Sequence, residues 1–268
     1  MRVPFRKMHG LGNDFVVLDR REGPGLPLEP AIIAALSDRH TGIGCDQLIL
    51  LEPSEQAEFA MRIYNCDGSE AEACGNAARA VALLTAGKTT IDTSGGSITV
   101  EPTSDGAVVN MGRPRFDWTA IPLSRSLNGE PLPRWADLPA PDFVNVGNPH
   151  AVFFVETMAD IDAATLGALI ERDDLFPQRI NVNFAEVTST STIELVVWER
   201  GAGLTRACGT GACATAVAAL RRGLVESPVN VRLPGGSLRI AWRPDEDILM
   251  AGPASEAFRG DFEWEDYA

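Results

Sequence analysis

Short apolar runs that follow glycine turns recur in the same order in both halves of the chain. GNDFVVLD begins at Gly12 and GNPHAVFFV begins at Gly147, while GGSITV begins at Gly95 and GGSLRI begins at Gly235. Two further runs, MRIYN (61–65) and IELVVWE (193–199), are rich in β-branched, aromatic and other apolar residues. Runs of this length and composition predict β-strands, and a glycine turn before a run marks its start.

Two alanine-rich runs predict helices, and each opens on a cysteine. CGNAARAVALLTAG begins at Cys74 and ends at Gly87, and CGTGACATAVAALRRG begins at Cys208 and ends at Gly223. Alanine and leucine favour helix, and glycine is the residue that most often stops one. Each helix follows a polar, glycine-bearing loop, so each half reads strand, loop, cysteine, helix, strand.

The equivalent landmarks keep a nearly constant spacing, which indicates an internal repeat. Cys208 follows Cys74 by 134 residues (208 − 74 = 134), and Gly147 follows Gly12 by 135 (147 − 12 = 135). We therefore predict an α/β (α+β) protein of two structurally equivalent halves, each of ordinary domain size. The stretch 113–142 has no clear period and is the expected linker, although Phe116 and Trp118 indicate that it packs against something.

Composition and charge exclude several classes of function. The 268 residues are 45% hydrophobic and carry a net charge of −14. This acidity argues against nucleic-acid partners, which require clustered Lys and Arg, and against binding to an anionic membrane surface. The N-terminus lacks the apolar core of a signal peptide, and no apolar run is long enough to span a membrane. We expect a cytoplasmic protein.

The cysteine pattern argues against disulfides and structural zinc. The chain has five cysteines and three histidines, and no CxxC occurs. An odd count without a signal peptide disfavours a disulfide framework, and these spacings do not match zinc sites, so we expect no metal. Cys213 is assigned to helix packing, and Cys45 and Cys66 lie beside polar loop residues without a matching partner.

Cys74 and Cys208 are the candidate reactive groups. A thiol at the first turn of a helix meets unpaired backbone N–H groups and the positive end of the helix dipole, which predicts a lowered pKa. Gly75 and Gly209 follow directly and leave the backbone open to a ligand. The alternative is that both are buried structural cysteines, but their equivalent places in the repeat favour a function.

Two equivalent thiols suit racemisation at an interface between the halves. One group removes a proton from one face of a carbon and the other delivers a proton to the opposite face. Helix N-termini directed at the substrate carboxylate would stabilise the carbanion without a cofactor.

Several polar residues at strand ends suit the binding of an amino acid. The amides are Asn13, Gln47, Asn65, Asn76, Asn148 and Asn181. Glu199 and Arg200 interrupt an apolar run and suit ammonium and carboxylate groups. The alternatives are turn asparagines and a solvated strand end. His150 is either a satisfied core residue or a group that tunes a thiol.

These motifs closely resemble the diaminopimelate epimerase family over nearly the whole chain. The resemblance rests on HGLGNDFVVLD, GIGCDQLIL, MRIYNCDGSEAEACGNAAR, NVGNPH, NVNFAEV, VWERGAGLTRACGTGACA and the closing GPASEAFRG. It implies a pyridoxal-phosphate-independent epimerase, without cofactor, that interconverts LL- and meso-diaminopimelate for lysine and peptidoglycan synthesis, and a homodimer. It also implies two domains, each a curved mixed or antiparallel sheet wrapped around a central helix, with the active site in the cleft between them.

The resemblance places the expected boundaries and roles. The first half would comprise 1–115 with a returning strand at about 253–268, and the second 116–252. Cys74 and Cys208 take the proton-transfer positions, and His150 and Glu199 match residues that adjust thiol acidity. The substrate-binding positions match Asn13, Gln47, Asn65, Gly75, Asn76, Asn148, Asn181, Glu199, Arg200, Gly209 and Thr210.

The chain departs from the family pattern at three positions, and two other functions stay open. Ala77 replaces the second glycine of the first box, Leu204 replaces a common glutamate, and Arg206 is atypical. None is assigned to the chemistry. A related racemase with a different amino-acid substrate is one alternative. A thiol redox or metal-binding protein is the other, and it predicts bound zinc or disulfide exchange.

Overall fold

The computed structural model describes residues 1–23, 25–71, 74–127 and 131–267. The chain divides into two compact units, which comprise Met1–Asn110 with Gly252–Ala268, and Met111–Ala251. The first division therefore falls between Asn110 and Met111, a few residues before the position 115/116 expected from the sequence. It falls there because Met111 N donates to Ile248 O at 2.9 Å, within the second unit.

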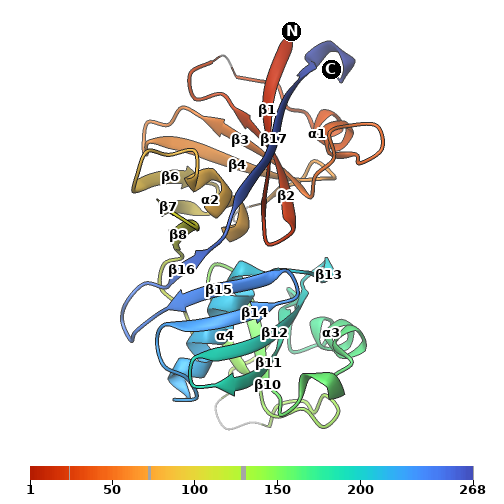
Figure 1. Ribbon diagram of the computed structural model, residues 1–268. Coiled ribbons are helices and arrows are strands. Elements are labelled where there is room, and N and C mark those ends of the chain that lie inside the picture. Colours follow the sequence, from red (N-terminus) through yellow and green to blue (C-terminus); the bar gives the residue numbers. More distant parts are fainter. Residues whose placement is uncertain (24, 72–73, 128–130, 268) are drawn as a thin grey trace. The chain divides into compact units, whose positions relative to one another are not determined.

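The first unit is a mixed sheet. Its strands are β1 (Arg2–Gly10), β2 (Asn13–Asp19), β3 (Gln47–Glu52), β4 (Phe59–Asn65), β5 (Glu70–Ala71), β6 (Thr89–Thr93), β7 (Gly96–Thr103), β8 (Gly106–Asn110) and β17 (Ser255–Glu263). The pairs β2–β3 and β4–β6 are parallel, and the pairs β17–β1, β1–β2, β3–β4, β4–β5, β6–β7 and β7–β8 are antiparallel. The last long strand, β17, returns alongside β1, so both chain ends belong to this unit (Figure 1).

Helix α2 (Gly75–Ala82) lies inside the curve of this sheet (Figure 1). It contacts β1, β7 and β8, although β1 and β8 are far apart in strand order. All eight of its residues are buried. Alanine and glycine dominate the helix because larger side chains would hold the surrounding strands away from it.

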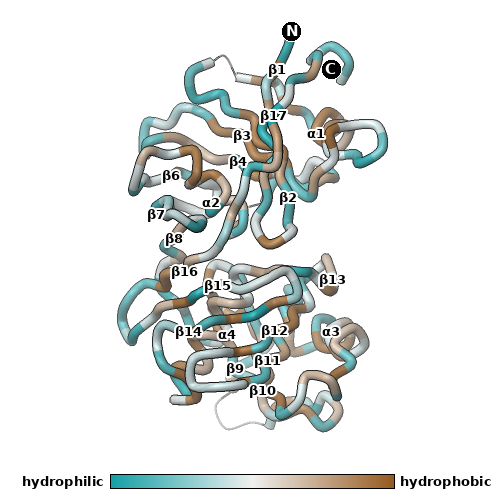
Figure 2. Tube along the Cα trace, in the orientation of Figure 1, coloured by the Kyte–Doolittle hydropathy of each residue, from teal (hydrophilic) through white to brown (hydrophobic). Residues whose placement is uncertain are grey.

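The other face of the sheet is covered by α1 (Pro30–Ser37). Its Ile32, Ile33 and Leu36 share one core cluster with alternate residues of β2 and β3, such as Leu18 and Leu48. The continuous apolar run of β3 reflects burial on both faces of a central strand. Figure 2 shows this run as hydrophobic, in contrast to the hydrophilic loops at the edges.

The second unit contains the other eight strands. They are β9 (Asp142–Asn145), β10 (Pro149–Phe154), β11 (Asn181–Ser189), β12 (Thr192–Glu199), β13 (Gly203–Leu204), β14 (Val229–Leu233), β15 (Gly236–Ala241) and β16 (Leu249–Gly252). Helix α4 (Gly209–Arg221) contacts β9, β10, β11, β12, β14 and β15, and α3 (Ala163–Glu171) covers the outer face of β11 and β12. The two short 3₁₀ helices are η1 (Met158–Asp160) here and η2 (Trp264–Asp266) in the first unit.

The two units share one topology, which confirms the predicted pseudo-symmetric α/β repeat. The pairs β10–β11 and β12–β14 are parallel, as are β2–β3 and β4–β6, and the intervening pairs are antiparallel in both units. The equivalent helices α2 and α4 each follow a two-residue strand, β5 or β13. The six apolar runs singled out in the sequence all form strands.

The expected linker is part of the second unit's core, which corrects the sequence-based description. Ile121, Leu123 and Trp135 are buried in a cluster with the aromatic residues of β10 and β11. Phe116 lies 6.5 Å from the Trp242 ring, whereas Trp118 is exposed. The stretch lacks periodicity because its apolar residues fill gaps singly instead of forming one face of a regular element.

The first helix is also shorter than predicted. It ends at Ala82 rather than Gly87, because the chain tightens into i→i+3 hydrogen bonds. Leu84 N donates to Val81 O at 2.9 Å, and the Thr85 hydroxyl donates to Ala82 O at 2.8 Å. The second helix ends as expected, since Gly223 follows it with φ +68°.

Candidate functional site

Cys74 is the N-cap of α2. Its backbone is extended (φ −147°, ψ 106°), and its Sγ accepts a hydrogen bond from Ala77 N at 3.4 Å. This bond satisfies one of the unpaired N–H groups of the first turn. The preceding Glu72 and Ala73 lie outside the described residues, so the first box is placed from Cys74 onward.

Two asparagines lie beside this thiol. Asn13, the first residue of β2, places Oδ1 3.7 Å from Cys74 Sγ. The same Oδ1 accepts from Asn76 Nδ2 at 3.1 Å. Buried Arg79 donates to Asn76 Oδ1 at 2.8 Å, so the orientation of the Asn76 amide is set by the helix itself.

Gln47 and Asn65 lie side by side where β3 begins and β4 ends. Gln47 Nε2 donates to Asn65 Oδ1 at 3.1 Å, and Asn65 Nδ2 donates to Ser69 Oγ at 3.1 Å. Within the described residues, the buried Gln47 Oε1 has no hydrogen-bond partner. A buried acceptor without a donor is costly, which marks this atom as one that a ligand donor would satisfy.

Cys208 is the N-cap of α4, in the position equivalent to Cys74. Its Sγ accepts from Gly211 N at 3.4 Å and lies 3.4 Å from the Thr210 hydroxyl. The thiol also donates to Glu199 Oε2 at 3.2 Å. The other carboxylate oxygen of Glu199 accepts from the Thr205 hydroxyl at 2.5 Å.

The pKa of Cys208 departs from the sequence-based expectation. A helix N-terminus was expected to lower it, but burial raises the pKa of this thiol, and the negative charge of Glu199 raises it further. The bond from Gly211 N acts in the opposite direction and does not compensate. Cys208 is therefore a protonated thiol in the ligand-free protein, because a desolvated thiolate beside a carboxylate is strongly disfavoured.

Asn181 connects β11 to the end of β12. Its Oδ1 accepts from Arg200 N at 2.9 Å, and its Nδ2 donates to Pro149 O at 2.8 Å. The Arg200 guanidinium contacts Gln178 O at 3.3 Å. These bonds fix the backbone at Arg200 directly after Glu199, so both charged side chains project from a defined strand end.

His150 is fully buried, and its recorded hydrogen bonds are to amides rather than to a thiol. Nε2 lies 2.9 Å from Asn148 Oδ1, and Nδ1 lies 3.1 Å from Asn183 Oδ1. Burial lowers the pKa of His150 to about 4. The ring is therefore neutral at physiological pH.

Sequence analysis missed several residues that support these groups. Thr205 holds Glu199, and Asn183 lies between His150 and α4. An asparagine within the buried run of β11 was the available signal for Asn183. Near Asn13, Asp46 accepts from the Asn13 amide at 3.1 Å, and Arg39 bridges Asp46 and Asp14.

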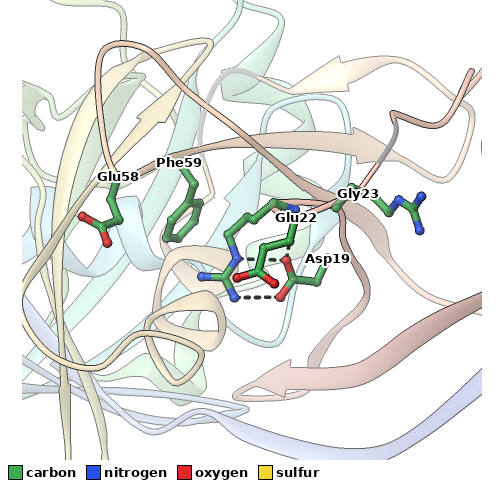
Figure 3. A pocket seen from close by; sticks show the side chains of 7 residues that line it. Asp19, Glu22, Gly23, Glu58 and Phe59 are labelled. Atoms are coloured by element: carbon green, nitrogen blue, oxygen red, sulfur yellow. Dashed lines mark hydrogen bonds and ion pairs between the residues drawn. The ribbon is translucent and has the colours of Figure 1, made fainter.

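A hollow in the first unit lies away from the Cys74 thiol. It is lined by residues that include Asp19, Glu22, Glu58 and Phe59 (Figure 3). Arg21 fills part of it, with its guanidinium 4.8 Å from the Phe59 ring and ion-paired to Asp19 at 2.7 Å. Asp19 ends β2, whereas Asn13 begins it, so the hollow and the Cys74 cluster lie at opposite ends of one strand.

Of the departures from the family pattern, Ala77 contacts the site only through its backbone N–H, which donates to Cys74 Sγ. Leu204 is half exposed on β13, where it pairs with Trp198, and Arg206 is exposed. Ala77 is buried in the first turn of α2. In the described part of the chain, no three His, Cys, Asp or Glu residues gather as metal ligands, and no helix is long and apolar enough to cross a membrane.

Comparison with known proteins gives consistent results. A family model described as diaminopimelate epimerase matches residues 5–117 and 143–256. The diaminopimelate epimerase of Erythrobacter litoralis is 59% identical, over 100% of both chains. That of Sphingopyxis alaskensis is 54% identical over 97% of both.

The fold also has solved relatives. The structure of a phenazine biosynthesis protein of the PhzF family from Bacillus anthracis matches with a TM-score of 0.68 at 13% identity. It covers 98% of this chain and 99% of that one, which shows a shared fold. Together, the family match across both units and the high identity to named relatives show that the chain belongs to the diaminopimelate epimerase family.

Proposed function

We propose that this protein interconverts LL- and meso-2,6-diaminopimelate without a cofactor, with Cys74 and Cys208 as the two proton-transfer groups, in lysine and peptidoglycan precursor synthesis. The observation that carries the proposal is the duplicated arrangement of a cysteine that caps a buried helix. Family membership supplies the substrate, because the close relatives are named for it.

The reaction inverts one carbon through a carbanion. One sulfur, as a thiolate, takes the proton from the α-carbon, and the electron pair of the C–H bond delocalises onto the adjacent carboxylate. The other sulfur, as a thiol, returns a proton to the opposite face, so the two cysteines exchange protonation states in each turnover. The mechanism requires both thiols to reach the same carbon.

Helix N-termini are suited to stabilise the carbanion. The first turns of the two helices present the backbone N–H groups of Gly75 and Asn76 in one unit and of Gly209 and Thr210 in the other. These groups lie at the positive end of each helix dipole. A substrate carboxylate placed there gains hydrogen bonds that strengthen as negative charge develops.

The environment of Cys208 suits the proton donor of the free enzyme. Burial and the charge of Glu199 keep its proton in place. Glu199 is therefore the group that we assign to thiol acidity. Because Asn65 takes the equivalent place in the first unit, the two thiols differ in charge environment although their backbones match.

Polar groups at the strand ends are suited to bind the unreactive end of the substrate. The unpartnered Gln47 Oε1 supplies an acceptor for an ammonium group, and Arg200 supplies a cation for a carboxylate. The full set of proposed substrate contacts is Asn13, Gln47, Asn65, Gly75, Asn76, Asn148, Asn181, Glu199, Arg200, Gly209 and Thr210.

Deuterium exchange tests the two-base mechanism. LL-diaminopimelate incubated with the protein in D₂O should gain deuterium at one α-carbon and convert to the meso form, as read by NMR and mass spectrometry. Cys74→Ala and Cys208→Ala should each abolish epimerisation. Epimerisation by either variant at the native rate contradicts the assignment.

A third cysteine provides the matched control. Cys213 is buried in the helix that Cys208 caps, five residues after Cys208, and we assign it to packing. Cys213→Ala should keep the native turnover with a modest loss of stability. Loss of activity in Cys213→Ala would mean that disturbed helix packing, rather than the missing thiol, explains the inactivity of Cys208→Ala.

Substrate breadth separates the proposal from a related racemase. The protein should act on LL-diaminopimelate and not on amino acids with one stereocentre, because the Asn, Glu and Arg groups bind the second centre. Comparable turnover of a single-centre amino acid would favour the racemase.

The wider assignments follow from the same proposal. We infer that residues 1–115 with about 253–268, and 116–252, are the two epimerase halves, and that the protein works as a homodimer. Sedimentation of the purified protein tests the dimer. All five cysteines are unbridged, which supports a cytoplasmic, reducing location.

A further inference from the structure

A chain of hydrogen bonds within the second unit connects helix α4 to Asn148. Asn183 Nδ2 donates to Gly211 O and to the Thr215 hydroxyl, both at 3.0 Å. Asn183 Oδ1 lies 3.1 Å from His150 Nδ1, and His150 Nε2 lies 2.9 Å from the atom placed as Oδ1 of Asn148. His150, Asn183 and Thr215 are each 0% exposed.

The Asn183 amide has only one acceptable orientation. Gly211 O is a backbone carbonyl and can only accept, so the amide nitrogen of Asn183 must face it. Its oxygen must then face the imidazole. Because that oxygen can only accept, Nδ1 of His150 carries the hydrogen.

The opposite ring nitrogen is therefore an acceptor. A buried imidazole without a carboxylate bound to it stays neutral, and burial together with the nearby charge of Arg200 holds the pKa of His150 at about 4. A neutral ring carries one hydrogen, which is on Nδ1. Nε2 then presents a lone pair to Asn148.

Asn148 can meet this lone pair only with its amide nitrogen. An oxygen at this place would set two acceptors against each other at 2.9 Å. A half-turn of the amide exchanges nitrogen and oxygen with little change in shape. Among the described residues, the Asn148 amide has no other recorded hydrogen bond that opposes this turn, and the side chain is half-buried.

We propose that Asn183 and neutral His150 act as positioning residues that hold the Asn148 amide with its nitrogen toward the ring and its oxygen toward the ligand. Asn148 thus offers an acceptor to an ammonium group of the substrate instead of a donor to a carboxylate. The identity of that ligand rests on the proposed function. The inference gives His150 a role in orienting Asn148, in addition to the adjustment of thiol acidity that the family resemblance implies.

Nitrogen NMR of the full-length protein tests the orientation without any activity. With ¹⁵N-labelled histidine, the chain gives three imidazoles, from His9, His40 and His150, and His150→Gln identifies the buried one. At neutral pH we expect protonated Nδ1 and unprotonated Nε2 at His150. A ring protonated at Nε2, whether neutral or cationic, overturns the proposal.

Two variants of similar bulk test the functional consequence. Asn183→Leu removes the group that selects the tautomer, so KM for LL-diaminopimelate should rise roughly fivefold to tenfold while kcat stays within about twofold. Thr215→Val removes only one acceptor of the Asn183 amide and leaves Gly211 O in place. It should lower thermal stability but keep the tautomer and KM.

The outcomes separate this inference from the proposed function. An unchanged KM in Asn183→Leu overturns the role of the hydrogen-bond chain. A rise of KM in Thr215→Val as large as the rise in Asn183→Leu also overturns it. If the native protein does not turn over diaminopimelate, the proposed function fails, and the NMR of the native protein still decides the tautomer.

Discussion

At the scale of single residues, the two capping thiols have equivalent backbones and different neighbours. Cys74 lies beside the neutral Asn13 amide, whereas Cys208 lies 3.2 Å from a Glu199 oxygen. A helix N-terminus favours thiolate, but burial and a carboxylate outweigh it at Cys208. Burial first, and the adjacent carboxylate second, therefore keep the proton on Cys208.

Removing the charge of Glu199 should lower the pKa of Cys208. Burial remains in Glu199→Gln, but the coulombic repulsion of the thiolate is lost. The alkylation rate of Cys208 against pH, followed by peptide mass spectrometry, should shift to lower pH. Glu194→Gln, an exposed residue of the same strand paired with Arg232, is the control. An unshifted profile in Glu199→Gln would show that its carboxylate does not act on the thiol.

Neutral, buried His150 should make the fold sensitive to acid. Burial lowers its pKa from 6.5 to about 4. Between pH 6.5 and pH 4, the unfolded chain therefore binds a proton at this residue that the native state does not bind. The free energy of unfolding should fall by about 3 kcal/mol as pH drops through this window. Urea titrations should show a smaller dependence of the unfolding free energy on pH in His150→Gln than in the native protein. The exposed His40→Gln should retain the native dependence.

At the scale of elements, the enclosed helix α2 is built mostly of small residues, and its one large side chain, Arg79, is buried and hydrogen-bonded to Asn76. All residues of α2 are buried, and a side chain at Gly10 of β1 would come within 3.2 Å of Arg79. Leu204 replaces a polar residue of the family pattern on the two-residue strand β13, where it is half exposed. The enclosed elements are therefore constrained by packing, and the short edge strand is not.

Ala77 should stabilise α2 without a catalytic role. It replaces the glycine that is usual in the family, and its side chain is fully buried in the first turn. Ala77→Gly should lower the free energy of unfolding by about 1 kcal/mol because glycine is the poorer helix former. Turnover should change by less than about twofold, since Ala77 contacts Cys74 through its backbone N–H. A large loss of activity would contradict this prediction.

Gly167 should be essential for the packing of α3 on β12. A Cβ there would lie 2.5 Å from Trp198, which is held by a 2.8 Å hydrogen bond to Glu171. Gly167→Ala should therefore destabilise the fold by about 1–3 kcal/mol. Gly87→Ala, where nothing lies within 4 Å, should be close to neutral and serves as the control in thermal unfolding. Equal effects of the two substitutions would contradict the packing argument.

At the scale of the whole molecule, the mechanism that we propose requires both units of the repeat. Each unit has its own sheet, its own core and one capping thiol. A two-base reaction needs one thiol from each. Neither unit is therefore expected to epimerise the substrate alone, although each encloses a helix of its own.

Oxidation should inactivate the protein reversibly. Two sulfurs that act on opposite faces of one carbon are kept apart while the substrate lies between them, but closure of the units without substrate would bring them within disulfide range. A mild oxidant should then join the peptides that contain Cys74 and Cys208, as detected by mass spectrometry, and a reductant should restore turnover. Cys66 is exposed, so Cys66→Ser should be used to exclude side reactions. Full activity after both thiols are consumed would exclude their role.

The sequence by itself determined the repeat, the six strands that follow from apolar runs, the capping cysteines and the family, because these depend on local pattern and spacing. Tertiary structure alone decided three further points. Burial and Glu199 raised the pKa of Cys208 above what its helix end predicts. The stretch 113–142 joined the core of the second unit. Asn183 and His150 came together from the neighbouring parallel strands β11 and β10, where His150 pairs with Asn181, two residues before Asn183. Desolvation and long-range hydrogen bonds depend on residues distant in the chain, which no local pattern encodes.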